Sequence, residues 1–174
     1  VKTNLFMKNY ERIYILGTSG SGKSFLGNKL SKQLKVPHYD LDDIYFIRKY
    51  DKPRSKESRT KKAKKLWAKK KWILDGGGGM WSRGAMKHAK LVIWLQTPFR
   101  IRSWRIFKRY IRRKGKYKET VKDCLGLIKH SGKYRFGKRH FHYRGHKNYL
   151  DKHNINYIII KNKKQLEKLY RMNK

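Results

Sequence analysis

Cysteine and long apolar runs are nearly absent from this sequence of 174 residues. Cys124 is its one cysteine, which excludes an internal disulfide. No signal peptide and no apolar run of spanning length is visible, so we expect a reducing, cytoplasmic setting and no membrane partner. A chain of this length buries a sizeable core unaided, and we expect one domain over residues 1–174.

Acidic residues are also scarce. The sequence has 11 Asp and Glu against 48 Lys and Arg, a formal net charge of +37. Polyanions complement such a charge, so nucleic acid is a candidate partner. Compositional bias is the alternative, because 33 of the 48 basic residues are Lys. The basic residues gather in 48–71 and 100–147, which we interpret as insertions or helices within the domain.

Short apolar runs recur along the chain and are continuous rather than alternating, which is typical of strands buried on both faces. They cover residues 12–16, 36–39, 72–74, 91–95 and 157–160. Helix-length segments lie between them, at 23–34, about 55–70, about 80–88, a long one from 99, and 163–170. This alternation predicts a three-layer α/β fold with a parallel sheet, whose ligands bind beyond the carboxyl ends of the strands.

One glycine-rich stretch lies between the first predicted strand and the first predicted helix. It matches the pattern G-x-x-x-x-G-K-[ST] and consists of Gly17, Thr18, Ser19, Gly20, Ser21, Gly22, Lys23 and Ser24. In such a loop, backbone N–H groups and the helix N-terminus surround a phosphate. Lys23 would contact the β- and γ-phosphates, and the Ser24 hydroxyl would bind Mg²⁺. The stretch predicts a site for ATP with Mg²⁺; a structural glycine-rich turn is the alternative.

Four further segments accompany this loop: 39–43 (YDLDD), 72–76 (WILDG), 91–98 (LVIWLQTP) and 102–113 (RSWRIFKRYIRR). In this order and spacing the chain resembles the adenylate-kinase-like P-loop small kinases, most closely the family of DNA topology modulation proteins (FlaR-type). The resemblance covers nearly the whole chain. It implies a five-stranded sheet of order 2-3-1-4-5, a basic acceptor-side insertion over about 44–71, and a lid and basic helical region over about 100–150.

Several positions depart from that family. Asp40 stands where His is frequent, and Gly77, Gly78 and Gly79 stand where Asn and an aromatic residue are expected. Arg83 is displaced by about two positions from the arginine expected after this loop. The departures fall on the acceptor side and leave the glycine-rich loop intact.

Four of the 11 acidic residues lie at the ends of predicted strands: Asp40, Asp42, Asp43 and Asp75. A carboxylate there holds the water shell of Mg²⁺ or accepts a proton from an attacking hydroxyl. Resemblance to shikimate- and adenylate-type kinases implies that Asp40 and Asp42 face the acceptor and the metal as catalytic residues. It also implies that Asp75 orders metal-bound water. Helix capping by Asp42 or Asp43 is the alternative.

A second glycine run, 76–79, follows the third predicted strand and allows the backbone to approach an acceptor closely. We expect acceptor contacts from Asp42, Gly76, Gly77 and Arg83. A flexible connection is the alternative interpretation of the glycines.

Helical spacing places four arginines along one face of the predicted lid: Arg102, Arg105, Arg109 and Arg112. Such a face suits phosphates whose charge spreads during transfer. We expect Arg109 or Arg112 to reach the γ-phosphate as a catalytic residue; a solvated basic face is the alternative.

Residues 134–149 interleave aromatic and basic side chains, which allows base stacking along a nucleic acid or, alternatively, packing of the aromatic rings into the core. His140, His142 and His146 suggest a metal site, but no acid or cysteine completes the set in this segment.

Together these features predict an ATP-dependent small phosphotransferase of the nucleotide- or shikimate-kinase type. Its acceptor would be a nucleotide or another small phosphorylated or hydroxyl compound. The alternative is a nucleic-acid- or ribosome-associated NTPase in which slow hydrolysis switches binding. A purely structural basic protein would leave the glycine-rich loop unexplained.

Overall fold

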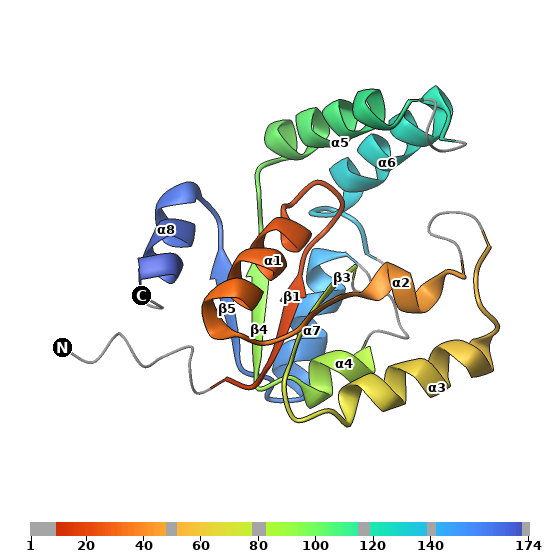
Figure 1. Ribbon diagram of the computed structural model, residues 1–174. Coiled ribbons are helices and arrows are strands. Elements are labelled where there is room, and N and C mark those ends of the chain that lie inside the picture. The colour runs from red at the N-terminus through yellow and green to blue at the C-terminus, as the bar shows by residue number, and fades with distance from the viewer. Residues whose placement is uncertain (1–9, 48–51, 78–82, 115–118, 139–141, 172–174) are drawn as a thin grey trace.

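The computed structural model describes residues 10–47, 52–77, 83–114, 119–138 and 142–171 (Figure 1). Five strands form one sheet: β1 (Arg12–Leu16), β2 (His38–Asp40), β3 (Trp72–Gly76), β4 (Leu91–Leu95) and β5 (Tyr157–Ile160). Their spatial order is β2-β3-β1-β4-β5, and all neighbouring pairs are parallel. The predicted fold class and strand order are confirmed.

Helices connect the strands in the described part of the chain. They are α1 (Lys23–Leu34), α2 (Leu41–Tyr45), α3 (Lys56–Trp67), α4 (Arg83–His88), α5 (Phe99–Arg113), α6 (Val121–Lys133), α7 (Tyr143–Lys152) and α8 (Lys163–Arg171). The long helical segment predicted from 99 is therefore three helices. Thr120 and Asp123 form a reciprocal capping box that begins α6.

The second strand begins at His38 rather than at residue 36. The Val36 N–H donates to the Ser31 carbonyl of α1 at 3.3 Å, so Val36 lies in the turn that closes the C-terminal end of that helix. Pro37 has no N–H for the sheet ladder, although its carbonyl accepts from the Ile73 N–H at 2.9 Å. Helix termination therefore delays the strand by two residues.

Successive side chains of a strand point to opposite faces, and the central strand β1 accordingly contributes to two cores. On one face Ile13 and Ile15 belong to a cluster with Leu26 and Leu30 of α1 and Leu169 of α8. This cluster joins one helical layer to the sheet.

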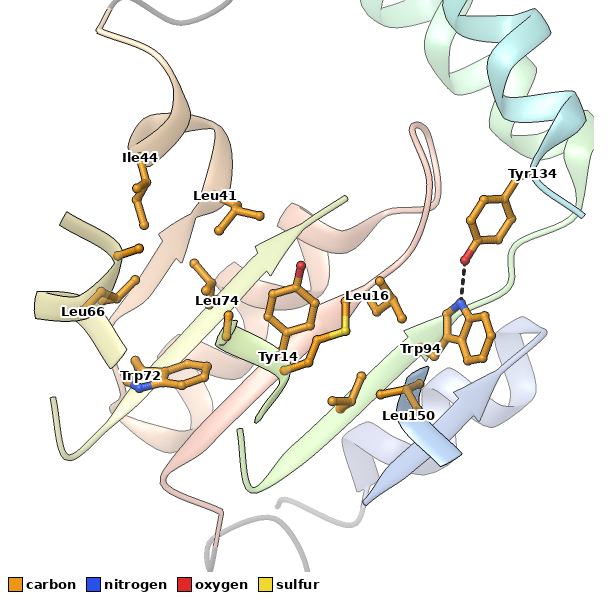
Figure 2. Packing of buried hydrophobic residues seen from close by; sticks show 14 residues of the cluster. Tyr14, Leu16, Leu41, Ile44, Leu66, Trp72, Leu74, Trp94, Tyr134 and Leu150 are labelled. Atoms are coloured by element: carbon orange, nitrogen blue, oxygen red, sulfur yellow. Dashed lines mark hydrogen bonds between the residues drawn. The ribbon is translucent and has the colours of Figure 1, made fainter. Parts of the chain in front are cut away.

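The other face of the sheet holds the larger core, shown in Figure 2. Tyr14 and Leu16 of β1 and Trp94 of β4 pack there with Leu66 of α3 and Leu150 of α7. Helices α2 and α4 contribute to the same cluster. The chain thus has the expected three layers, with the sheet between two sets of helices.

Helices α5 and α6 lie side by side and project beyond the sheet (Figure 1). Their small shared core contains Ile106, Tyr110 and Cys124. None of the helices in the described ranges is both long and apolar enough to cross a bilayer.

Tyrosines of the aromatic and basic segment lie in the core, so the base-stacking interpretation is wrong for them. Tyr134 is 6% exposed, and Tyr143 and Tyr149 pack against the same cluster. The Trp94 Nε1–H donates to the Tyr134 hydroxyl at 3.0 Å, and the His146 Nδ1 lies 2.8 Å from that oxygen (the Trp94 bond is dashed in Figure 2). Burial raises the pKa of Tyr134.

The histidine metal site finds no support in the described part of the chain. His142 and His146 are buried, at 6% and 3% exposure. No group of three His, Cys, Asp or Glu side chains that could hold a metal ion occurs among the described residues. His140 and Phe141 lie outside the described residues.

Candidate active site

A cleft of about 2070 Å³ lies at the carboxyl ends of the strands, where a parallel sheet places its ligands. Its walls come from the loop after β1, the ends of β2 and β3, helices α5 and α6, and the loop after β5. Among the expected site residues it gathers Ser19, Gly20, Ser21, Gly22, Lys23, Ser24, Asp40, Asp42, Asp75, Gly76, Gly77, Arg109 and Arg112. Gly17, Thr18 and Arg83 are not part of this lining.

The glycine-rich loop has a backbone shape that only glycine adopts without strain. Gly20 and Gly22 have φ angles of 77° and 97°. A Cβ on Gly20 would stand 2.5 Å from the Arg102 carbonyl oxygen, so α5 also packs against the loop backbone. The Ser21 carbonyl accepts from Thr97 Oγ1 at 2.8 Å. The loop is thus fixed against both the end of β4 and α5.

Lys23 lies over the loop instead of pointing into solvent. It is half-buried, and its Nζ donates to the Thr18 carbonyl at 3.2 Å. Burial lowers the pKa of Lys23, while the nearby carboxylates of Asp75, Asp42 and Asp40 act in the opposite direction. The Thr18 carbonyl thus provides a local acceptor for the ammonium. The ammonium and the three carboxylates nevertheless share one cleft.

Asp75 is the last residue but one of β3, and its carboxylate is buried, at 2% exposure. His38 of β2 bonds to it, with 2.9 Å between His38 Nε2 and Asp75 Oδ2. The other ring nitrogen lies 3.0 Å from Asn28 Oδ1 of α1. His38 therefore ties β2, β3 and α1 together beneath the cleft.

Sequence reasoning did not select His38. Its one available signal was its position near the end of a predicted strand, two residues before Asp40. The pairing depends on the strand register, which sets His38 opposite Ile73 and Asp40 opposite Asp75. A register of this kind is a tertiary property that the local pattern of apolar residues does not define.

Asp40 caps α2, a role that the sequence had suggested for Asp42 or Asp43. Its Oδ1 accepts the Asp42 N–H at 2.9 Å. Asp42 lies in the first turn of α2 and lines the cleft. Asp43 is exposed and is not part of the cleft lining. Asp40 is therefore the capping side chain, and Asp42 is a second carboxylate of the cleft in the same turn.

The second glycine run is partly explained by packing. A Cβ on Gly76 would stand 2.5 Å from the Leu41 Cβ, so the approach of α2 to β3 requires glycine there. A Cβ on Gly77 would meet no atom within 4 Å. Gly77 faces open space in the cleft, whereas Gly78 and Gly79 lie outside the described residues.

Arg83 lies away from the expected acceptor position. Its guanidinium carbon is 4.6 Å from the ring centroid of Tyr149, a cation–π contact. The Tyr149 hydroxyl donates to the Arg83 carbonyl at 3.1 Å. This arrangement provides a packing role for Arg83 between α4 and α7.

The arginines of α5 do not share one environment, contrary to the single face that we expected. Arg102 is 6% exposed, and its Nη1 donates to the Ser131 carbonyl at 2.8 Å and to Ser131 Oγ at 2.6 Å. Burial lowers the pKa of Arg102. Arg109 and Arg112 line the cleft. The reason is that α6 covers the Arg102 side of α5, a contact that helical spacing alone does not reveal.

Arg105 is a further cleft residue, which we had placed on the arginine face without a specific role. Its Nη1 donates to the Ser21 carbonyl at 3.2 Å and to the Gly20 carbonyl at 3.4 Å. The guanidinium therefore connects α5 directly to the glycine-rich loop. A cation at this point lies beside any phosphate that the loop binds.

The donor set of the cleft fits Mg²⁺ held together with phosphates. Ser24 presents an exposed hydroxyl at the start of α1, and Asp75 supplies a carboxylate on the same cleft. Mg²⁺ prefers such oxygen donors and commonly keeps waters and substrate phosphates as its other ligands.

Comparison with solved structures supports the fold. The shikimate kinase from Acinetobacter baumannii in complex with shikimate aligns with a TM-score of 0.58 at 20% identity, over 98% of each chain. A gluconokinase from Sinorhizobium meliloti aligns with a TM-score of 0.51 at 14% identity, over 93% of this chain and 88% of the other.

Comparison of the sequence with curated proteins finds two bacterial relatives. The uncharacterized protein YqaC of Bacillus subtilis is 39% identical over 106 residues, which is 60% of either chain. A shikimate kinase of Enterococcus faecalis is 32% identical over 103 residues, 51% of this chain and 61% of the relative. The chain thus matches about three fifths of the length of these relatives.

The family model that matches is that of the shikimate kinases, over residues 19–149. It does not test the finer resemblance to the topology modulation proteins, which stays a prediction. The matched range contains most of the glycine-rich loop, the carboxylates and the cleft-lining arginines. The chain belongs to the shikimate kinase family of P-loop kinases, which use ATP with Mg²⁺.

Proposed function

We propose that this chain is an ATP-dependent kinase that transfers the γ-phosphoryl group to the hydroxyl of a small acceptor. One observation supports this most directly: a phosphate-type loop, three carboxylates and a row of cations meet in one cleft. Phosphoryl transfer requires such positioning and charge stabilisation rather than covalent help from the protein. Membership in the shikimate kinase family points to the same reaction.

In the proposed mechanism the loop from Gly17 to Ser24 holds the triphosphate, and Lys23 moves its hydrogen bond from the Thr18 carbonyl to the β- and γ-phosphates. The acceptor oxygen forms a bond to the γ-phosphorus. The bond from that phosphorus to the β–γ bridging oxygen breaks, and ADP leaves. Asp42 accepts the hydroxyl proton, because the Asp40 carboxylate is held by its capping bond.

Cations of α5 stabilise the charge that spreads over the transferred group. We assign this role to Arg109 and Arg112, which line the cleft, with Arg105 beside the loop. When bound, Mg²⁺ would neutralise phosphate charge. Ser24 and Asp75 are the residues that would hold it.

The acceptor is a nucleotide or another small phosphorylated or hydroxyl compound, and shikimate is one candidate because of the Enterococcus relative. Asp42, Gly76 and Gly77 form the acceptor wall in this proposal. Gly77 contributes open space beside the carboxylates.

A mass-resolved product screen tests the proposal. The chain is incubated with ATP, Mg²⁺ and a panel of shikimate, nucleosides, nucleotides and oligonucleotide ends. We expect one class of acceptor to accelerate ADP formation and to gain the mass of a phosphoryl group. ADP formation that no acceptor accelerates would contradict a kinase role.

The second candidate is a nucleic-acid- or ribosome-associated NTPase in which slow hydrolysis switches binding. The exposed lysines of α3 favour it, since Lys61, Lys62, Lys64 and Lys65 all face solvent. This function predicts ATP hydrolysis that responds to RNA or DNA and yields no phosphorylated small molecule.

A further inference from the structure

Helix α5 carries an apolar stripe that no described element covers. Trp104, Phe107 and Ile111 are 63%, 45% and 52% exposed. Their spacing of three and four residues sets them along one side of the helix. The rings of Trp104 and Phe107 lie 6.2 Å apart between centroids.

Helix α6 continues this apolar surface. Val121 and Leu125, one turn apart, are 59% and 60% exposed. Gly132 lies on the same stripe of α6, eleven residues after Val121. A ring carbon of Phe99, which is 45% exposed, stands 3.2 Å from where a Gly132 Cβ would be. The α6 stripe therefore borders the aromatic side of α5. We call the six apolar residues the outer face: Phe99, Trp104, Phe107, Ile111, Val121 and Leu125.

The outer face points away from the cleft. On α5 the buried side chains of Ile106 and Tyr110 lie between the two exposed sides of the helix. Arg105 and Arg109 line the cleft on one side of that buried stripe, and Phe107 lies on the other. A ligand on the outer face would leave the nucleotide site open.

Charge around the outer face is of one sign. Arg100 of α5, Lys114 directly after α5 and Lys129 of α6 are exposed. Residues 99–138 contain two acids, Glu119 and Asp123, and both line the cleft. The outer face thus combines exposed aromatic and aliphatic side chains with a basic border.

We propose that the outer face docks on a lipid bilayer surface with anionic headgroups. Trp and Phe with Ile, Val and Leu suit the boundary between headgroups and acyl chains, and basic side chains bind anionic headgroups. Single-stranded nucleic acid fits less well, because bases stack on aromatic rings and not on Ile111, Val121 or Leu125. A second copy of this chain fits less well because each copy has a formal charge of +37.

This proposal departs from our expectation of no membrane partner. That expectation rested on the lack of an apolar run of spanning length. Docking on a surface needs an amphipathic face instead, and the spanning criterion does not examine it.

Sedimentation with lipid vesicles tests the proposal on the full chain. We expect binding to phosphatidylcholine vesicles containing about one third phosphatidylglycerol to be roughly tenfold stronger than to pure phosphatidylcholine. The double variant Trp104→Ser, Phe107→Ser should lose about tenfold of the binding to anionic vesicles. Its affinity for ATP should stay unchanged, which also shows that the variant is folded.

Two control variants test whether vesicle binding depends on the outer face itself, or on any exposed aromatic side chain or any group of lysines. Phe136→Ser removes a side chain that is 84% exposed and follows α6. Replacing Lys61, Lys62, Lys64 and Lys65 by Gln removes four charges from α3. We expect both controls to keep more of the vesicle binding than the double variant does.

Three results would overturn the proposal. The first is that the double variant does not bind vesicles more weakly than the α3 variant does. This covers full retention of binding by the double variant and an equal loss of binding by both variants. The second is a double variant that keeps vesicle binding but loses binding to oligothymidine, which would assign the outer face to nucleic acid. The third is self-association of the parent chain that the double variant abolishes, with vesicle binding unchanged.

Discussion

Two of the walls of the cleft obtain their geometry in different ways. On the loop wall the backbone is the binding element, with positive φ at Gly20 and Gly22. On the wall formed by β2 and β3, side chains of three elements hold one another, through His38, Asn28 and Asp75. Eight consecutive residues define the first wall, whereas strand register defines the second. We call the wall formed by β2 and β3 the carboxylate wall. A substitution in the loop wall should therefore affect mainly its own contacts, whereas one in the carboxylate wall should also disturb the side chains bonded to it.

The largest expected effect is on the loop wall. Lys23→Ala removes the ammonium that we propose contacts the β- and γ-phosphates, and turnover of ATP should fall about a thousandfold or more. The measurement is steady-state ADP formation, with Lys90→Ala, an exposed lysine outside the cleft, as the matched control. If Lys23→Ala turned over ATP like the parent chain, the proposed contact of Lys23 with the phosphates would be wrong.

Asp42→Asn probes the carboxylate wall. It keeps the shape of the side chain and removes its basicity, so phosphoryl transfer should fall about a hundredfold or more, with little change in ATP affinity. Single-turnover kinetics measure the rate of phosphoryl transfer, and calorimetry measures the ATP affinity. Asp43→Asn in the same helical turn is the control, because Asp43 is exposed and outside the cleft. Equal small effects of both variants would contradict a base role.

Two arginines of α5 sharpen the comparison within one helix. Arg109→Ala should lower turnover by about tenfold to a hundredfold with little change in thermal stability, because the side chain lines the cleft. Arg102→Met should instead destabilise the fold by roughly 2 kcal/mol, since the Ser131 acceptors lose their buried donor. Thermal unfolding and ADP formation are measured for both. A loss of stability in Arg109→Ala together with a loss of turnover alone in Arg102→Met would contradict these two assignments.

Much of the loop wall could be predicted from the sequence, because the glycines, Lys23 and Ser24 are adjacent in the chain. The parallel sheet followed from the pattern of apolar runs, and its strand order followed from the family resemblance. The separation of Arg102 from Arg109 could not be predicted, since helical periodicity does not say which face a neighbouring helix covers. His38 was missed for a related reason: its partners, Asn28 and Asp75, come from two other elements.

His38→Phe tests the network of the carboxylate wall. The substitution removes the bond to Asp75, so that carboxylate loses its fixed orientation toward the cleft. We expect the Mg²⁺ concentration needed for tight ATP binding to rise by about tenfold. Calorimetry of ATP binding across Mg²⁺ concentrations measures this. Asn28→Ala, which keeps the His38–Asp75 bond, should give a smaller change; a loss of stability without a change in the Mg²⁺ requirement would assign His38 a structural role.

The smallest expected effect concerns the basic helix α3. If its lysines bind single-stranded nucleic acid, replacing Lys61, Lys62, Lys64 and Lys65 by Gln should reduce the logarithmic salt slope by up to about three. Fluorescence anisotropy with oligothymidine at several salt concentrations measures the slope. Four scattered exposed lysines, Lys32, Lys90, Lys152 and Lys164, form the control set. Equal effects of both sets would favour compositional bias over a defined surface.

The central claim is that the γ-phosphoryl group goes to an acceptor hydroxyl and not to water. Mass spectrometry after reaction in ¹⁸O-enriched water tests it directly, in the presence of the acceptor found by the product screen. We predict that most of the ADP formed is matched by phosphorylated acceptor without ¹⁸O, and that little ¹⁸O enters inorganic phosphate. Quantitative appearance of ¹⁸O-labelled phosphate with no phosphorylated acceptor would contradict the kinase account and favour the NTPase.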